Sequence, residues 1–289
     1  MKLNQHEREA AAILIGMALL EDVGPGDITT GNLIPSGIRK KADMRAKADG
    51  VVAGLEVAEM VFHRLGGDLK WMPELKDGDP VKKGDVIVTF EADYRVLLTG
   101  ERTALNFMQR MSGVATASAA YQKIVKETTT KILDTRKTLP GFRLLDKYAV
   151  RAGGASNHRI GLYDMVMIKD NHIAVAGGIT PAIKTIREKV DKGILIEVET
   201  CNLAEVAEAL EAGADIIMLD NMDNDTMRQA VQLINGRAKT EASGNMSTER
   251  LASVAATGVD FISVGALTHS VKALDISMTI YPDDPLDNL

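Results

Sequence analysis

This sequence has little cysteine, few aromatic residues and no excess of basic charge. Its single cysteine, Cys201, excludes an intramolecular disulfide and a metal site built from several cysteines, and it fits a reducing cytoplasm. Aromatic residues make up only 4% of the chain, so a core must consist mainly of Leu, Ile, Val, Ala and Met. The formal net charge of -6 argues against a generally basic surface for nucleic acid, although it permits a local basic pocket.

Long apolar segments are missing as well. No apolar run reaches the roughly 20 residues that a membrane-spanning helix needs. The segment 1–24 is charged early and lacks the basic-then-apolar order of a signal peptide, so we interpret residues 5–20 as an amphipathic helix. We therefore expect a cytoplasmic protein with no membrane contact. The 289 residues, 45% of them hydrophobic, suffice for a large core or two domains.

Residues 1–112 have a mixed rhythm that predicts an antiparallel sheet with helices. Short strand-like segments are separated by turn signals such as Asp49-Gly50, Asp77-Gly78 and Lys83-Gly84. A longer helix follows from about Val96, in which Ser112-Gly113 marks a candidate break. We take residues 1–112 as a first domain, to which the alternating segment 271–289 returns as a strand.

Residues 113–270 form the second predicted domain, in which strand, loop and helix repeat regularly from Lys131. The proposed strands are apolar runs at residues 131–134, 165–170, 194–199, 215–220, 238–243 and 260–265. Helix signals lie between them: the expected N-caps are Thr180 (before Pro181), Asn202 and Ser247, and the expected stops are Gly213 and Gly258. This alternation predicts a parallel sheet covered by helices, of the kind found in barrels of βα units.

Every proposed strand ends in polar or small residues. In chain order these are Asp134, Arg136, Lys137; Lys169, Asp170, Asn171, His172; Glu197, Glu199; Asp220, Asn221; Glu241, Ser243, Gly244; and Ser263, Gly265. A charge after one strand is often only a loop charge. Because the carboxyl ends of parallel strands meet at one face, six such ends in phase instead predict an active site.

The chemical types also sort along this face. One arc is cationic and consists of Arg136, Lys137 and Lys169, with His158 and Arg159 from the loop between them. Guanidinium and ammonium groups converge where an anion binds, although Lys169 could instead form a salt bridge with Asp170 or Glu199.

The rest of the face is acidic, then rich in small residues. The acidic arc has Glu199 and Asp220, with Glu197 and Glu241 nearby, and suits sugar hydroxyls or Mg²⁺. Ser243-Gly244, before a helix, suits a phosphate. The pattern thus predicts an acid at one end of the site and a phosphorylated, hydroxylated partner at the other.

These motifs resemble the quinolinate phosphoribosyltransferase family over almost the whole chain. The segments that carry the resemblance are "LLEDVGPGDITT", "LTGERTALNFMQRMSGVAT", "DTRKTLPGFRLLDKYAVRAGGASNHRIGLYD", "MIKDNHI", "IEVET", "LDNM", "EASGN" and "SVGALTHS". The resemblance implies an N-terminal α/β sandwich joined to an open seven-stranded α/β barrel. It also implies a homodimer, or a higher oligomer, with shared active sites. The implied reaction joins quinolinate to 5-phosphoribosyl 1-diphosphate with Mg²⁺, releasing diphosphate and CO₂ and giving nicotinate mononucleotide for NAD synthesis.

The same resemblance implies residue roles. Arg136, His158, Arg159 and Lys169 would bind the carboxylates of quinolinate, with Lys137 beside them towards the diphosphate. Arg102 would reach into the partner's site. Glu199 and Asp220 would hold the ribose hydroxyls and the metal-bound diphosphate, and Ser243, Gly244 and Gly265 would line the 5-phosphate site. Among these, Lys137, Lys169, Glu199 and Asp220 would be catalytic. One departure is Ala155, where the family pattern has a glycine.

Two other interpretations stay open at this stage. A related barrel enzyme could act on another acid or phosphoribosyl compound. The turn-rich segment 77–92 is also similar to the strands of biotinyl and lipoyl carrier domains, which would make the protein a carrier. A carrier needs a modifiable lysine in a tight hairpin, which the segment lacks, and it needs neither charged arc.

Overall fold

The computed structural model describes residues 1–281, which fall into two compact units. Unit 1 comprises residues 1–119, 138–154 and 268–281, and unit 2 comprises residues 120–137 and 155–267. Of the predicted returning segment, residues 282–289 lie outside the described residues. In the described part, no helix is long and apolar enough to cross a membrane.

Unit 1 contains an antiparallel sheet in the order β12-β1-β5-β3. The strands are β1 (Arg39–Ala46), β3 (Lys70–Pro73), β5 (Val86–Asp93) and β12 (Ile276–Ile280). A two-stranded sheet pairs β2 (Gly50–Val51) with β4 (Pro80–Val81). The rings of Phe62, Trp71 and Phe90 cluster in the core of unit 1, with 5.1 Å between the Phe62 and Phe90 centroids. The predicted antiparallel sheet is confirmed, and the end of the described chain supplies one of its edge strands.

Five helices accompany these strands, and the longest is not broken. They are α1 (Gln5–Asp22), α2 (Ile28–Leu33), α3 (Leu55–Leu65), α4 (Tyr94–Ile124) and α5 (Arg143–Ala152). The break expected at Ser112-Gly113 is wrong, because both residues serve contacts of an intact helix. The Ser112 hydroxyl exchanges hydrogen bonds with the backbone of Ala53 at 3.0 and 3.1 Å. A Cβ on Gly113 would lie 2.4 Å from the carbonyl oxygen of Lys272, so only glycine fits.

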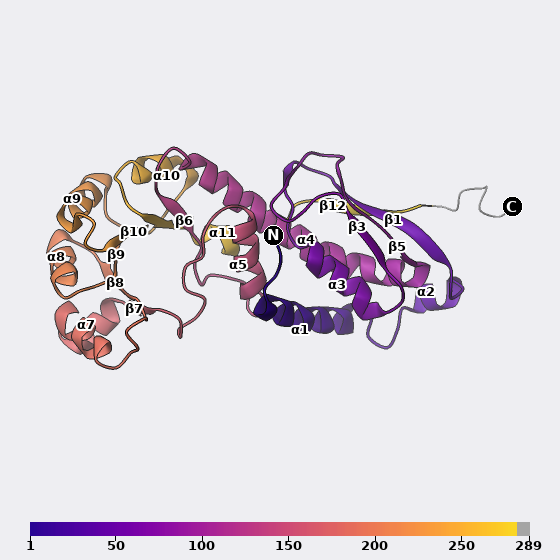
Figure 1. Cartoon of the computed structure of the whole chain (residues 1–289), viewed down its shortest axis with the longest axis horizontal. Coiled ribbons are helices and arrows are strands. Elements are labelled where there is room, and N and C mark those ends of the chain that lie inside the picture. Colours follow the sequence, from indigo (N-terminus) through magenta and orange to yellow (C-terminus); the bar gives the residue numbers. More distant parts are fainter. Residues whose placement is uncertain (282–289) are drawn as a thin grey trace. The chain divides into compact units, whose positions relative to one another are not determined.

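Unit 2 contains a parallel sheet in the order β6-β11-β10-β9-β8-β7 (Figure 1). Its strands are β6 (Lys131–Leu133), β7 (Val166–Ile168), β8 (Ile196–Thr200), β9 (Ile216–Asp220), β10 (Lys239–Ser243) and β11 (Phe261–Ser263). All six predicted strands are therefore present. The sheet has one strand fewer than the resemblance implied, and Ser156 adds a single parallel bridge to Leu133 at the β6 edge. Within residues 1–281, no ladder joins β6 to β7.

Short helices follow the strands of unit 2. They are α6 (Asp170–Ala176), α7 (Ile179–Arg187), α8 (Leu203–Glu211), α9 (Asn224–Ile234), α10 (Thr248–Ala255) and α11 (Ala266–His269). Figure 1 shows α7 to α10 one after another along one side of the strands. The caps expected at Asn202 and Ser247 are confirmed. Thr180 is not the cap of α7, which begins after Gly178, because the Thr180 hydroxyl and N–H both donate to Glu208 Oε1 instead.

Candidate active site

The carboxyl ends of the parallel strands bring charged side chains to one edge of the unit 2 sheet. Ile168 is paired with Val198, so Lys169 and Glu199 come next on neighbouring strands, and their side chains form an ion pair. Ser243 of β10 lies opposite Asp220 of β9 in the strand register, so these two strand ends are also neighbours. The Lys169–Glu199 pair is one of the two salt bridges expected as an alternative for Lys169. Its lysine side chain is still 45% exposed, which leaves room for an incoming anion.

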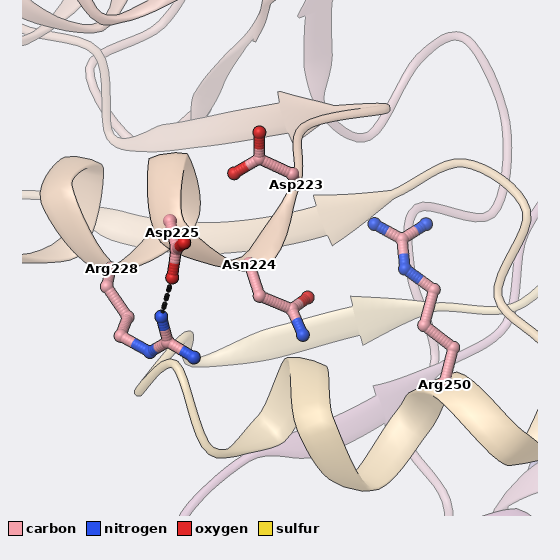
Figure 2. A pocket seen from close by; sticks show the side chains of 5 residues that line it. All are labelled: Asp223, Asn224, Asp225, Arg228 and Arg250. Atoms are coloured by element: carbon pink, nitrogen blue, oxygen red, sulfur yellow. Dashed lines mark hydrogen bonds and ion pairs between the residues drawn. The ribbon is translucent and has the colours of Figure 1, made fainter.

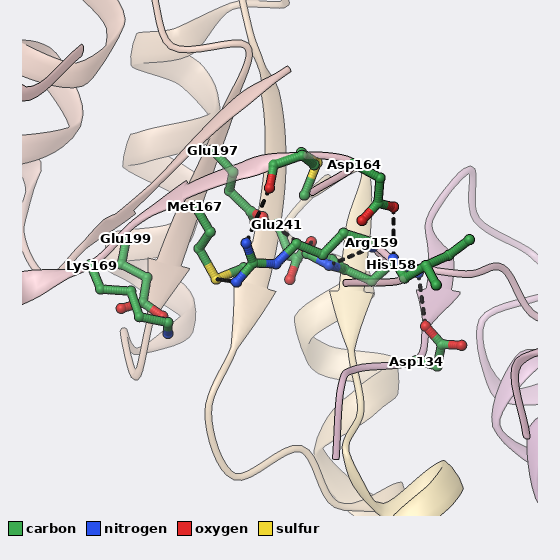
Figure 3. A network of polar contacts seen from close by, with 11 residues as sticks. Asp134, His158, Arg159, Asp164, Met167, Lys169, Glu197, Glu199 and Glu241 are labelled. Carbon is green, nitrogen blue, oxygen red and sulfur yellow. Dashed lines mark hydrogen bonds and ion pairs between the residues drawn. The ribbon is translucent and has the colours of Figure 1, made fainter. Parts of the chain in front are cut away.

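Asp134 fixes the loop that carries His158 and Arg159. Its buried carboxylate accepts a hydrogen bond from the backbone N–H of His158 and one from the amide of Asn157, both at 2.8 Å (Figure 3). Ala155, the departure from the family pattern, has no left-handed backbone, so its Cβ causes no conformational strain. The loop is thus held from inside the sheet without the expected third glycine.

His158 points inward, onto two buried glutamates. Its Nε2 lies 2.9 Å from Glu197 Oε2 and 3.4 Å from Glu241 Oε2, and all three side chains are nearly or fully buried. Burial, then the neighbouring Glu241, raises the pKa of Glu197 to about 7. Burial lowers the pKa of His158, but the two glutamates outweigh it and raise this pKa to about 10. The cluster therefore favours a proton on Nε2.

These three groups could be mistaken for a metal site, since their ligand atoms lie within 4.8 Å of one another. The ring itself accounts for the approach of the two carboxylates, through ion pairs with Nε2. His158 Nδ1 lies 2.8 Å from the backbone N of Arg159, and Nε2 lies against the two carboxylates. Both ring nitrogens contact the protein itself.

Arg159 and Arg136 give the site its positive character. Arg159 donates to the carbonyl oxygen of Met165 at 3.1 Å and contacts Met167 Sδ at 3.7 Å, which fixes its guanidinium. Its pKa is lowered by burial and by repulsion from Arg136, against the attraction of Glu197, Asp164 and Glu199. Both side chains carry guanidinium groups, which suit the planar carboxylate of an anionic substrate.

Arg136 and Lys137 are exposed residues just after β6. The backbone N–H of Lys137 donates to Thr135 Oγ1 at 3.1 Å, which shapes this turn. Gly265 follows β11, the neighbour of β6 in the sheet. Arg136 and Lys137 therefore follow the edge strand next to the last strand end, whereas Lys169 follows β7, the other edge strand of the sheet.

The turn after β10 has the geometry of a phosphate cradle. Gly244 has φ +94°, and a Cβ there would lie 2.1 Å from Asn221 Oδ1. Asn221 and Asn245 are also left-handed, with φ of 53° and 49°. The Asn221 N–H donates to Ser243 O at 3.0 Å, while its side chain donates to Asp220 at 2.8 Å. Successive turns of this kind aim backbone N–H groups at an anion, next to the N-terminus of α10.

Glu199 and Asp220 are the residues that could hold Mg²⁺. They supply carboxylate oxygens at the ends of the adjacent strands β8 and β9, and neither is buried. Oxygen donors that keep access to water and to a diphosphate are what Mg²⁺ prefers. The residues therefore fit this metal.

Arg102 lies in unit 1, where it is an exposed residue of α4. It lines a hollow of about 310 Å³ together with residues at the end of α1 and the start of α2, among them Asp22, Asp27 and Ile28. One residue near the phosphate cradle escaped the sequence prediction. Arg250 in α10 contacts two turns of the site, and the only hint in the sequence is a basic residue in the first turn of a helix, where acidic residues are preferred.

The parallel sheet places this chain among α/β proteins in which charged and polar side chains gather at the carboxyl ends of the strands. The models of the N-terminal and C-terminal domains of quinolinate phosphoribosyl transferase match residues 27–112 and 114–279 of this chain. The chain belongs to the quinolinate phosphoribosyltransferase family.

Similar proteins agree with this assignment over most of their length. Quinolinate phosphoribosyltransferase (decarboxylating) 1b of Nicotiana tabacum is 46% identical, over 92% of this chain and 81% of the relative. The probable nicotinate-nucleotide pyrophosphorylase (carboxylating) of Bacillus subtilis is 45% identical, over 92% of each chain. The crystal structure of NadC from Streptococcus pyogenes is 40% identical with a TM-score of 0.94, covering 98% of this chain and all of that chain.

Proposed function

We propose that this chain is a pentosyltransferase that moves the phosphoribosyl group of 5-phosphoribosyl 1-diphosphate to quinolinate, with loss of CO₂. The products are nicotinate mononucleotide, diphosphate and CO₂, in de novo NAD synthesis. The observation that carries the proposal is the presence of the cations Arg136, Arg159 and Lys169 on the same parallel sheet as the Gly244 turn. A dicarboxylate suits the first feature, and a sugar phosphate suits the second.

Binding of the acid is the role of the cationic arc. Arg136, Arg159 and Lys169 hold the two carboxylates of quinolinate, and the Met165 carbonyl keeps the Arg159 guanidinium in place. His158 contributes by anchoring this loop on Glu197, and its ring has to turn before a nitrogen can reach the acid directly. Positioning of this kind lowers the barrier because the reacting atoms are held in line.

Transfer of the ribosyl group uses the acidic arc. The bond between ribose C1 and the diphosphate oxygen breaks, diphosphate leaves with the electron pair, and the ring nitrogen of quinolinate supplies a pair for the new bond to C1. Carboxylates of Glu199 and Asp220 beside the ribose stabilise the positive charge that develops on the sugar. Lys137 offsets charge on the leaving diphosphate. When bound, Mg²⁺ would offset that charge too, held largely through diphosphate and water by Glu199 and Asp220.

Decarboxylation follows from the new bond. Once the ring nitrogen is bonded to ribose it is cationic, and it stabilises the electron pair left on the adjacent carbon when CO₂ departs. That carbon then takes a proton. The protein supplies charge and position for this step, and no side chain has to act as a nucleophile.

A homodimer with shared sites fits unit 1. The α1 side chains of Ile13, Met17 and Leu20 are 65%, 64% and 74% exposed, and their spacing places them along one stripe of the helix. A stripe of this kind is typical of a covered interface. Arg102 lines the hollow at the end of the same helix, which supports its role in the site of the partner subunit. The single cysteine, Cys201, is exposed and suits the reducing cytoplasm, where we place the enzyme.

The test is a product assay with purified protein, 5-phosphoribosyl 1-diphosphate and either quinolinate or nicotinate, with and without Mg²⁺. We expect nicotinate mononucleotide and CO₂ in equal amounts from quinolinate, none from nicotinate, and no product without Mg²⁺. A folded protein that makes no product from quinolinate would contradict the proposal and point to another acid as the substrate.

A further inference from the structure

Arg250 stands where a helix disfavours a cation. It is the third residue of α10 (Thr248–Ala255), so its guanidinium is close to the positive end of the helix dipole. An arginine in that place needs hydrogen-bond acceptors that offset the repulsion by the helix dipole. Arg250 donates to two backbone carbonyls, Met222 O at 2.7 Å and Gly244 O at 3.1 Å.

The two carbonyls belong to different turns of the candidate site. Met222 follows Asp220 and Asn221 after β9, and Gly244 begins the phosphate cradle after β10. A backbone hydrogen bond from the Asn221 N–H to Ser243 O also joins these turns. Arg250 therefore links the two turns, because one rigid, planar guanidinium holds both carbonyls at a fixed separation.

A second arginine on the same hollow makes no such connection. Arg228 of α9 lines the hollow of about 470 Å³ with Asp223, Asn224, Asp225 and Arg250. Its guanidinium pairs with Asp225 three residues earlier in the same helix, and both side chains are largely exposed. Figure 2 shows Arg228 and Arg250 on either side of Asn224, with the Asp225–Arg228 pair on the Arg228 side. Arg228 is thus a matched control for charge in this place.

We propose that Arg250 is a positioning residue for the phosphate of the phosphoribosyl substrate. By fixing the Met222 and Gly244 carbonyls, it sets the separation of the two turns, so that the backbone N–H groups after Gly244 face the phosphate. Its positive charge behind the turn adds to the field that the anion meets. The inference rests on the proposed function, since it names the phosphate that the cradle holds.

The experiment compares the unmodified enzyme with Arg250→Gln, Arg250→Lys and Arg228→Gln. We expect Arg250→Gln to raise the KM for 5-phosphoribosyl 1-diphosphate about tenfold and to leave the KM for quinolinate within about twofold. Arg250→Lys should recover part of the loss, because it keeps the charge and one contact. Arg228→Gln should match the unmodified enzyme. Calorimetric binding of ribose 5-phosphate gives a second readout that needs no turnover, and it should weaken about tenfold in Arg250→Gln only.

Several outcomes would overturn the inference. They are unchanged KM and binding in Arg250→Gln, an equal rise of both KM values, or an unmodified chain that does not bind ribose 5-phosphate. If Arg250→Gln does not fold, Arg250→Lys decides, with an expected rise of about threefold confined to the phosphoribosyl substrate. Weakened ribose 5-phosphate binding in an enzyme that makes no product from quinolinate would support the role of Arg250 and contradict the proposed function.

Discussion

Lys137 and Lys169 both follow strands of the same sheet, but their surroundings differ. Lys169 is paired with Glu199, so an acid that binds to it takes the place of a carboxylate already there. Lys137 lies in an exposed turn after β6, shaped by the Thr135 hydroxyl. An exposed cation just after a strand end is placed to offset charge on a leaving diphosphate.

Replacing Lys137 with Ala should lower kcat by about two to four orders of magnitude and leave stability nearly unchanged, since the side chain is exposed. Steady-state kinetics and thermal unfolding measure the two effects. Lys126→Ala is the control, because Lys126 is an exposed lysine of the same unit paired only with Glu127. Full turnover in Lys137→Ala would remove Lys137 from the mechanism.

The buried cluster of His158, Glu197 and Glu241 predicts a pH dependence of stability. The folded pKa of His158, about 10, lies above its ordinary value of about 6.5. The charged ring therefore stabilises the fold fully below about pH 6.5, and this contribution is lost as the pH rises towards 10. Glu241→Gln removes one of the two carboxylates that raise this pKa, so the variant should lose less stability between pH 7 and 10.

Urea unfolding of the unmodified chain and Glu241→Gln at pH 7, 8, 9 and 10 measures that difference. Taking differences between the two proteins cancels the lysines and tyrosines that titrate in the same range. If the two stability curves stay parallel across the range, Glu241 does not control the charge of His158.

At the scale of elements, the strands and their shared edge could be predicted, but the burial of individual residues within a strand could not. The apolar runs of unit 2 indicated strands, and parallel pairing then required their charged ends to meet. Glu197 and Glu199 lie on the same side of β8, and only Glu197 is fully buried. The sequence therefore grouped them in one acidic arc, although one supports His158 and the other faces the site. The start of α7 was missed because Glu208 of the next helix binds Thr180.

The turn after β10 gives an element-scale prediction. Gly244→Ala has two costs, the left-handed backbone and a Cβ at 2.1 Å from Asn221 Oδ1. Gly213→Ala is the matched control, with φ +84° and no atom within 4 Å of the added Cβ. We expect the control to lose about 1 kcal/mol, and Gly244→Ala to lose at least about 1 kcal/mol more and to bind ribose 5-phosphate poorly. Urea unfolding and calorimetry measure both, and equal losses would show that Asn221 moves aside at no cost.

For the whole molecule, the main question is what covers the apolar stripe of α1. With Ile13, Met17 and Leu20 exposed, and Ile28 of α2 81% exposed, unit 1 carries more accessible apolar side chains than a monomer needs. A second copy of the chain covers such a stripe by two-fold symmetry, because the same stripe meets itself. The exposed stripe therefore supports the proposed dimer independently of the sheet edge in unit 2.

Mixing two inactive variants tests the shared site. Arg102→Ala and Lys137→Ala should each be nearly inactive, because each removes one cation from every site. If Arg102 serves the partner's site, random exchange of subunits restores one intact site in each mixed dimer, or about a quarter of full activity. The mixture should gain activity with the time course of subunit exchange. A mixture that stays inactive after exchange, checked by mass of tagged dimers, would place Arg102 in the site of its own chain.

The pairing of β12 with β1 has a consequence for the order in which the protein is made. Ile276–Ile280 complete the sheet that Arg39–Ala46 begins, so more than two hundred residues leave the ribosome between the two halves of one ladder. Until then, one edge of β1 stays without its partner strand and can attach to other growing chains. Synthesis that stops before Ile276 should therefore leave a product that aggregates, even though every residue of the candidate site has been translated.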